Sequence, residues 1–142
     1  MQEKLQITLE TASSVEDERT LHHKLVEYNR AASSDDHVQP LNLIVRDENG
    51  VVIGGLLGDT YWNWLAINIF WLREDLRKQG LGSRLLQMAE VEAIRRGCQY
   101  AHLDTFDFQA LDFYRKYGYT VFGQLDGLPP GHTRYFLRKT LA

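Results

Sequence analysis

The chain has 142 residues, of which 44% are hydrophobic and 25% charged, and its formal net charge is −3. A chain of this size suits one core, so we expect a single domain over residues 1–142. The small negative charge excludes a global attraction to nucleic acid or to an anionic membrane surface.

Cysteine content and hydropathy narrow the protein class further. Cys98 is the single cysteine, which excludes an intramolecular disulfide and a cysteine metal cluster, and favours a reducing compartment. No run approaches the ~18 apolar residues of a membrane span, and residues 1–10 lack the apolar centre of a secretory signal. We therefore expect a cytoplasmic protein with no membrane partner.

The first elements are predicted from alternation and capping signals. Apolar residues at positions 5, 7 and 9 alternate with polar ones, which predicts a half-buried strand. Ser13 and Glu16 have capping-box spacing, which predicts a helix that begins there and ends near Ala32. The Asn49-Gly50 turn joins two apolar runs, 41–46 and 51–57, as a hairpin.

Beyond this hairpin the sequence predicts a mixed pattern of strands and helices. An aromatic and β-branched run over 61–72 reads as one long strand. Apolar residues at helical spacing predict a helix over 81–94 that stops at Gly97. The remaining predicted elements are a strand over 100–105, a helix over 109–117, and strands over 119–125 and 133–137. This order indicates an α+β domain whose strands 61–72 and 100–105 are parallel.

A glycine turn after the long strand is the most informative segment. Gly80 and Gly82 stand where a polar loop meets the start of a helix, and Arg77 and Lys78 precede them. Helix N-termini carry unpaired N–H groups and partial positive charge, so they bind anions, and glycines let a bulky phosphate approach. The turn is also compatible with an ordinary surface loop, or with a domain that binds the phosphates of ATP.

Two motifs together resemble the GNAT superfamily of N-acetyltransferases. Arg77-x-x-Gly80-x-Gly82 resembles the family's pyrophosphate loop, and residues 110–119 resemble its A-x-x-F-Y-x-x-x-G-F/Y signature. The likeness extends over about residues 41–142. It implies the GNAT fold, an α+β domain with a mixed, mostly antiparallel sheet of about seven strands and helices on both faces.

The resemblance also implies acetyl-CoA as cosubstrate, without a metal. In the family the strand before the loop bulges and splays from its parallel neighbour, and the pantetheine arm lies in that gap. Many members have an asparagine before Ala110, where Gln109, or Asp107, is the candidate here. The implied cofactor-binding residues are Phe70, Trp71, Leu72, Arg77, Lys78, Gln79, Gly80, Leu81, Gly82, Ser83 and Gln109.

The resemblance implies a general acid but leaves the base open. Tyr114 matches the family tyrosine that protonates the departing thiolate. The glutamate that many members place before the loop is missing, since residues 61–72 contain no acid. Asp104 is the candidate substitute, either as base or as a ligand of the ammonium, and proton loss to ordered water is the alternative.

The expected function is transfer of an acetyl group to a primary amine by direct attack in a ternary complex. The acceptor would be a small molecule or a peptide, and a homodimer is expected by resemblance. Trp62 and Trp64 are predicted on one face of the long strand, where they would wall an acceptor pocket or pack in a core or dimer surface. The alternative function is a non-catalytic module that binds and senses acyl-CoA.

Overall fold

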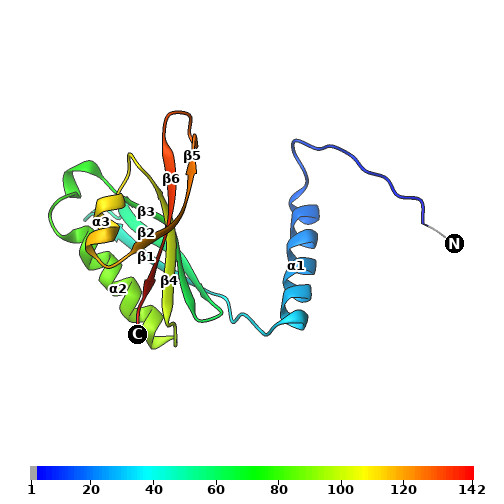
Figure 1. Cartoon of the computed structure of the whole chain (residues 1–142), viewed down its shortest axis with the longest axis horizontal. Helices are drawn as coiled ribbons and strands as arrows, with labels where there is room; N and C mark the ends of the chain where they lie inside the picture. The colour runs from blue at the N-terminus through cyan, green and yellow to red at the C-terminus, as the bar shows by residue number, and fades with distance from the viewer. Residues whose placement is uncertain (1–2) are drawn as a thin grey trace. The chain divides into compact units, whose positions relative to one another are not determined.

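The computed structural model describes residues 3–142 (Figure 1). The chain divides into two compact units, with the boundary between Asp36 and His37. No helix in the described residues is long and apolar enough to cross a membrane. The single-domain organisation stays a prediction, and the two units are described separately.

The N-terminal unit consists of an extended segment and the helix α1 (Val15–Ala32). The predicted strand over residues 5–9 is wrong, because these side chains are exposed and no described strand pairs with them. Alternation cannot stabilise a strand that has no neighbour to satisfy its backbone. The helix cap is Ser14 rather than Ser13, since the Ser14 hydroxyl accepts a hydrogen bond of 3.1 Å from the Asp17 N–H.

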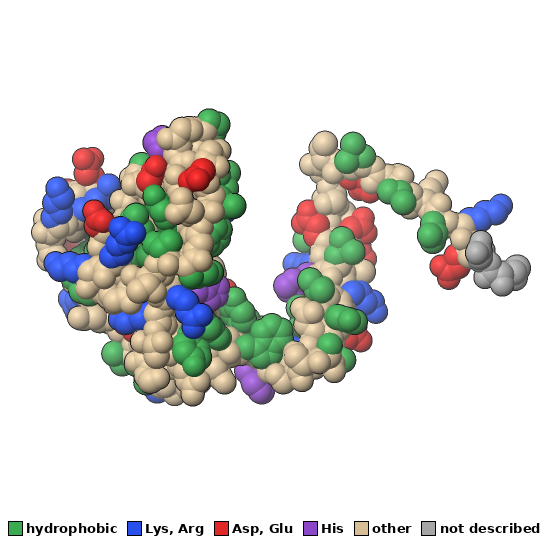
Figure 2. Space-filling view, in the orientation of Figure 1, with side chains coloured by type: hydrophobic (Ala, Val, Ile, Leu, Met, Phe, Trp, Pro, Cys, Tyr) green, Lys and Arg blue, Asp and Glu red, His purple; other side chains and the backbone are tan. Residues whose placement is uncertain are grey.

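The helix α1 ends at Ala32, as predicted, and is amphipathic without burying any residue. Its apolar stripe contains Leu21, Leu25 and Tyr28, all exposed. Figure 2 shows hydrophobic side chains at the surface of this helix between acidic and basic ones.

The second unit is built on a mixed sheet of six strands in the order β1-β2-β3-β4-β6-β5, rather than the seven or so expected. The pair β3·β4 is parallel, as predicted, and the other neighbours are antiparallel. The elements are β1 (Gln39–Arg46), β2 (Val52–Tyr61), β3 (Trp64–Leu72), the short 3-10 helix η1 (Glu74–Leu76), α2 (Leu81–Arg95), β4 (Tyr100–Phe106), α3 (Leu111–Lys116), β5 (Thr120–Asp126) and β6 (Thr133–Thr140).

A two-residue turn separates β2 from β3. Trp62 and Asn63 have positive φ angles of 44° and 65°, and Tyr61 pairs directly with Trp64. Both central residues of the tightest hairpin turns adopt this left-handed geometry. The prediction of one strand over 61–72 was therefore wrong at its start, because the aromatic content of Tyr61-Trp62 outweighed the turn signal of Asn63.

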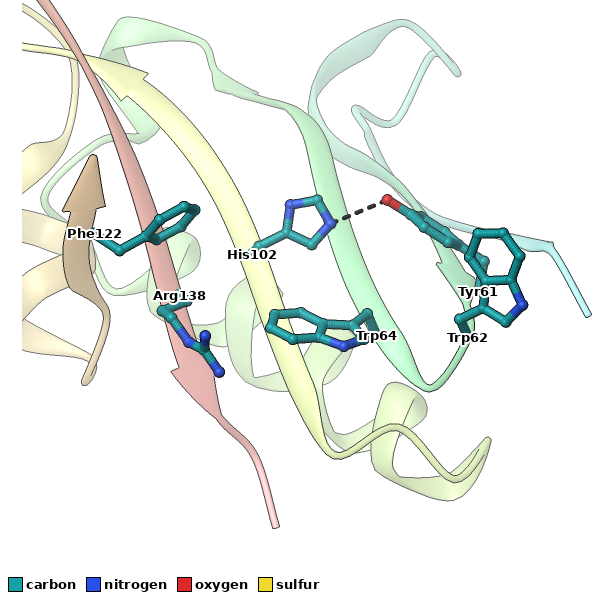
Figure 3. A pocket seen from close by; sticks show the side chains of 6 residues that line it. All are labelled: Tyr61, Trp62, Trp64, His102, Phe122 and Arg138. Atoms are coloured by element: carbon teal, nitrogen blue, oxygen red, sulfur yellow. Dashed lines mark hydrogen bonds between the residues drawn. The ribbon is translucent and has the colours of Figure 1, made fainter. Parts of the chain in front are cut away.

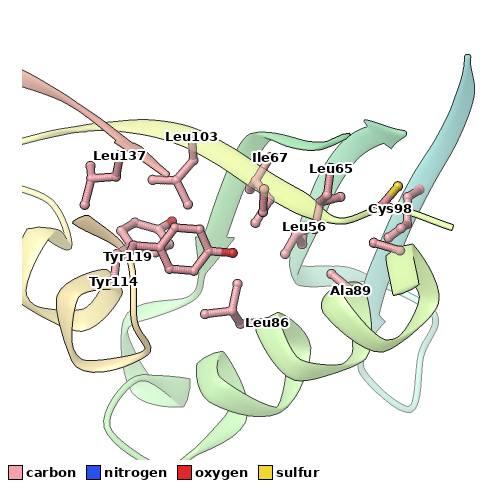
Figure 4. Packing of buried hydrophobic residues seen from close by; sticks show 13 residues of the cluster. Leu56, Leu65, Ile67, Leu86, Ala89, Cys98, Leu103, Tyr114, Tyr119 and Leu137 are labelled. Carbon is pink, nitrogen blue, oxygen red and sulfur yellow. The ribbon is translucent and has the colours of Figure 1, made fainter. Parts of the chain in front are cut away.

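The core lies between one face of the sheet and the helices α2 and α3 (Figure 4). Leu86 and Ala89 of α2 and Tyr114 of α3 pack against sheet residues such as Leu65 and Leu103. Side chains alternate along a strand, so the intervening residues project from the opposite side, which we call the second face. The second face carries Asp59, Tyr61, Trp64, His102, Asp104, Phe136 and Arg138.

A β-bulge interrupts β3 at Asn68. Leu57 pairs with Ile69 but Gly58 pairs with Ile67, which leaves Asn68 as the extra residue. A Cβ atom built on Gly58 would lie 2.5 Å from the Ala66 carbonyl oxygen, so only glycine allows the two strands to approach this closely. Gly58 therefore helps to shape the strand that carries the bulge.

Substituting Gly58 by alanine is expected to destabilise the fold by about 1–3 kcal/mol, because a backbone atom must move to admit the methyl group. Thermal unfolding should show a Tm lower by several degrees. Gly123→Ala in β5 is the matched control, since a Cβ there meets nothing within 4 Å. Equal Tm values for the two variants would contradict this account of the bulge.

Candidate active site

The gap between β3 and β4 is the central feature of the site. Their parallel pairing ends at Ile67 and Leu103, although β3 continues to Leu72 and β4 to Phe106. The strands therefore splay just where the bulge at Asn68 bends β3. The expected splay and bulge are both present, and the segment with Phe70, Trp71 and Leu72 forms one wall of the gap.

The glycine turn leads from β3 into α2. Gly80 is the N-cap of α2 with φ +82°, a left-handed value that favours glycine, and no side chain caps the helix. Residues 3–142 offer no hydrogen-bond acceptor to the backbone N–H groups of Leu81, Gly82 and Ser83. These N–H groups and the helix dipole together make an anion-binding terminus.

Polar side chains of the turn brace it from within. Arg77 Nε donates to the Leu72 carbonyl oxygen at 2.9 Å, and Gln79 Nε2 donates to the Asp75 carbonyl oxygen at 2.7 Å. Ser83 Oγ donates to the Gly80 carbonyl oxygen at 2.9 Å. These hydrogen bonds hold the shape of the loop, and the roles of Arg77, Gln79 and Ser83 in binding the cofactor stay predictions.

Tyr114 lies beneath the gap. It is 6% exposed, and its ring contacts Phe70 of β3 at 6.4 Å and Phe113 at 5.3 Å between centroids. The ring belongs to the buried core cluster. Burial and, to a smaller extent, the charge of Asp104 raise the pKa of Tyr114 to about 12. The phenol is therefore a protonated donor at neutral pH.

Asp104 lies on β4 next to the gap but is paired with Arg134. Arg134 Nε donates to Asp104 Oδ1 at 3.0 Å, and the guanidinium packs 5.1 Å from the centroid of the Phe136 ring. The ion pair with Arg134 fixes the position of this carboxylate, and a role for Asp104 as base or as ligand of the ammonium stays a prediction. The pair presents an ordered carboxylate to the second face.

Gln109 and Asp107 brace the end of β4. Gln109 Oε1 accepts from the Phe106 N–H at 2.9 Å and from the Thr105 hydroxyl at 3.2 Å. Asp107 accepts from the Thr133 N–H at 3.1 Å, and its Oδ1 lies 2.9 Å from His132 Nδ1. Both residues shape the loop before α3, and Gln109 as a cofactor contact stays a prediction.

A hollow of about 440 Å³ opens on the second face, lined by Tyr61, Trp62, Trp64, His102, Phe122 and Arg138 (Figure 3). The Tyr61 hydroxyl and His102 Nε2 are 3.1 Å apart. Burial lowers the pKa of His102, against an opposing effect of Asp104, which favours the neutral imidazole. Burial also raises the pKa of Tyr61, with a smaller contribution from Asp59.

Of the six residues that line the hollow, Trp62 and Trp64 are the two that the sequence predicted near an acceptor. Trp62 and Trp64 both line it, although Trp62 does so from the turn rather than from a strand. The sequence did not predict His102, Phe122 or Arg138 in this hollow. The alternation of side chains along a strand could have placed His102 and Arg138 on the second face. It puts His102 on the same face as Asp104, and Arg138 on the same face as Arg134.

The sequence profile of the acetyltransferase (GNAT) family matches residues 6–119. The chain belongs to this family. Both the family prediction and the α+β fold class are thereby confirmed.

Individual proteins similar to this chain support the assignment to the GNAT family. Acetyltransferase Atu2258 of Agrobacterium fabrum (strain C58) is 36% identical over 135 residues, which cover 95% of this chain and 98% of that protein. Blasticidin-S acetyltransferase of Streptomyces morookaense is 40% identical over 95 residues, 66% of this chain and 70% of that protein. A crystal structure from Agrobacterium tumefaciens superposes with a TM-score of 0.91 at 35% identity, and covers 96% of this chain and 99% of that one.

The family and these relatives show that the GNAT chain is an acetyl-transferring enzyme. The prediction of an acyltransferase is therefore confirmed. This outcome disfavours the non-catalytic sensing module that the missing strand glutamate had left open.

Proposed function

We propose that this enzyme transfers the acetyl group of acetyl-CoA to a primary amine of a small molecule, by direct attack in a ternary complex. The observation that carries the proposal is the gap that opens beyond Ile67 and Leu103, between the uncapped start of α2 and the hydroxyl of Tyr114. A small-molecule acceptor is favoured by the name of the Streptomyces relative, a blasticidin-S acetyltransferase.

The cosubstrate would bind through its diphosphate and its pantetheine arm. The N–H groups of Leu81, Gly82 and Ser83 are directed at the position of an anion before α2, and Arg77 and Lys78 add positive charge to the loop. Backbone groups of Phe70, Trp71 and Leu72 line the gap and can pair with the amides of the arm, as a sheet edge pairs with an added strand.

The chemical step balances with the residues at the gap. The amine nitrogen attacks the thioester carbonyl, the C–S bond breaks, and the thiolate takes a proton from Tyr114. The proton that the nitrogen releases as the amide forms then restores the Tyr114 hydroxyl. An N–H group freed by the bulge at Asn68 can stabilise the oxyanion. The amine loses its proton to water, and Asp104, held by Arg134, orients the ammonium or that water before attack.

The proposal is tested by binding and turnover with the intact chain. Calorimetry should show CoA binding, and ATP binding more weakly, because ATP lacks the pantetheine arm that the gap accommodates. Acetyl-CoA with a panel of primary amines should release thiol in proportion to the acetylated amine. A preference for ATP, or an absence of CoA binding, would overturn the proposed function.

A further inference from the structure

We infer that the hollow on the second face is the acceptor subsite, and that it selects amines whose far end carries a planar ring and a carboxylate. This inference rests on the proposed function, because it assumes that the amine reacts at the gap between β3 and β4. It assigns a substrate class that neither the family nor the relatives specify.

The hollow lies next to the gap along β4. Ala66, His102, Arg138 and Thr120 occupy one row across β3, β4, β6 and β5, and Asp104 lies two residues further along β4. Two residues of a strand span ~7 Å, so a molecule seated at His102 can reach the splayed strands with an amine at about that distance. The hollow therefore holds the body of an acceptor rather than its reacting nitrogen.

Arg138 is the residue that favours an acceptor with a carboxylate group. Two other cations of β6 have carboxylate partners, since Arg134 pairs with Asp104 and Lys139 with Glu90. Within residues 3–142, Arg138 has no carboxylate partner, and its guanidinium instead lies 5.1 Å from the centroid of the Trp64 ring. A planar guanidinium held against an aromatic ring keeps its fork of donors in place for a carboxylate.

The aromatic lining is the feature that points to a ring. Four aromatic rings line the hollow, those of Tyr61, Trp62, Trp64 and Phe122. Tyr61 is fixed further by its contact with His102. Aromatic side chains favour a planar ring in offset or edge-to-face contact. An aliphatic chain would cover the same surface without this preference.

The inference is tested with three amines that differ in one feature each. The probe 4-(2-aminoethyl)benzoate carries ring and carboxylate, 2-phenylethylamine lacks the carboxylate, and 6-aminohexanoate lacks the ring. We expect kcat/KM for the first probe to exceed that for each of the others about 10-fold or more, because 2-phenylethylamine loses the Arg–carboxylate pair and 6-aminohexanoate loses the ring contacts.

Variants separate the two contributions. Arg138→Gln should lower kcat/KM for 4-(2-aminoethyl)benzoate about 10-fold or more but leave 2-phenylethylamine within about threefold, and Arg138→Lys should be intermediate because it keeps the charge without the fork. Trp64→Leu should abolish the preference over 6-aminohexanoate. Lys116→Gln, at the end of α3, is the control for net charge, and Tm and CoA affinity are measured for every variant.

The outcomes distinguish this inference from the proposed function. Equal turnover of the three amines by the unmodified enzyme would overturn the inference and leave acetyl transfer intact. Binding of CoA without turnover of any of the three would also overturn it. A failure to bind CoA would overturn the proposed function and the inference together.

Discussion

Replacing Tyr114 by phenylalanine is expected to lower kcat about 10²-fold, because the thiolate then leaves without a proton donor. The affinity for CoA should stay the same, since the ring and its contacts with Phe70 and Phe113 are retained. Steady-state kinetics of thiol release and calorimetry with CoA measure the two quantities on the same preparation.

Tyr117→Phe is the matched control, because Tyr117 lies at the end of the same helix and packs against Phe113. It should leave kcat within about twofold. A normal kcat in Tyr114→Phe would remove the phenol from the mechanism, whereas equal losses in both variants would indicate damage to α3 instead.

The pH dependence adds a second check on the same residue. Burial raises the pKa of Tyr114 to about 12, so its protonated form persists across the neutral and mildly alkaline range. As the pH rises, more of the amine is uncharged, and kcat should therefore not decline through loss of the Tyr114 proton below about pH 10. A decline in kcat near neutral pH that disappears in Tyr114→Phe would contradict this assignment.

Features that depend on neighbouring residues in the chain could be predicted from the sequence. The hairpin at Gly50 and the glycine start of α2 both follow from local turn chemistry or helical spacing. The two motifs then gave the fold class, because they stand in the family order. These are cases in which local preference and the final fold agree.

Features that depend on contacts between residues far apart in the chain could not be predicted from the sequence. The hollow takes side chains from β2, β3, β4, β5 and β6, and Arg138 lies beside His102 because β6 is inserted between β4 and β5. Neither that strand order nor the pairing of Asp104 with Arg134, 30 residues away, leaves a periodic signal in the sequence. At residues 5–9 the sequence pattern predicted a strand that does not form, because no partner strand pairs with these residues.

Introducing a carboxylate at Ser83 should separate cofactor binding from folding. An acidic residue in the first turn of α2 stabilises the helix by about 0.3–1 kcal/mol, so the Tm of Ser83→Asp without ligand should be unchanged or slightly higher. The same charge lies close to where the diphosphate of CoA is proposed to bind. At ~6 Å and an effective dielectric constant of ~20, repulsion amounts to roughly 3 kcal/mol, or about a 10²-fold weaker affinity.

Ser83→Asn is the control that isolates the effect of the charge. The Asn side chain has nearly the same shape as Asp, and both variants lose the hydrogen bond from Ser83 Oγ to the Gly80 carbonyl oxygen. The difference in CoA affinity between the two variants should shrink as salt is raised, since exposed charges are screened over about 8–10 Å near physiological ionic strength. If the Ser83→Asp and Ser83→Asn variants bound CoA with equal affinity at low salt, the start of α2 could not be the diphosphate site. The gap between β3 and β4 would then have no anchor for the arm that it is proposed to hold.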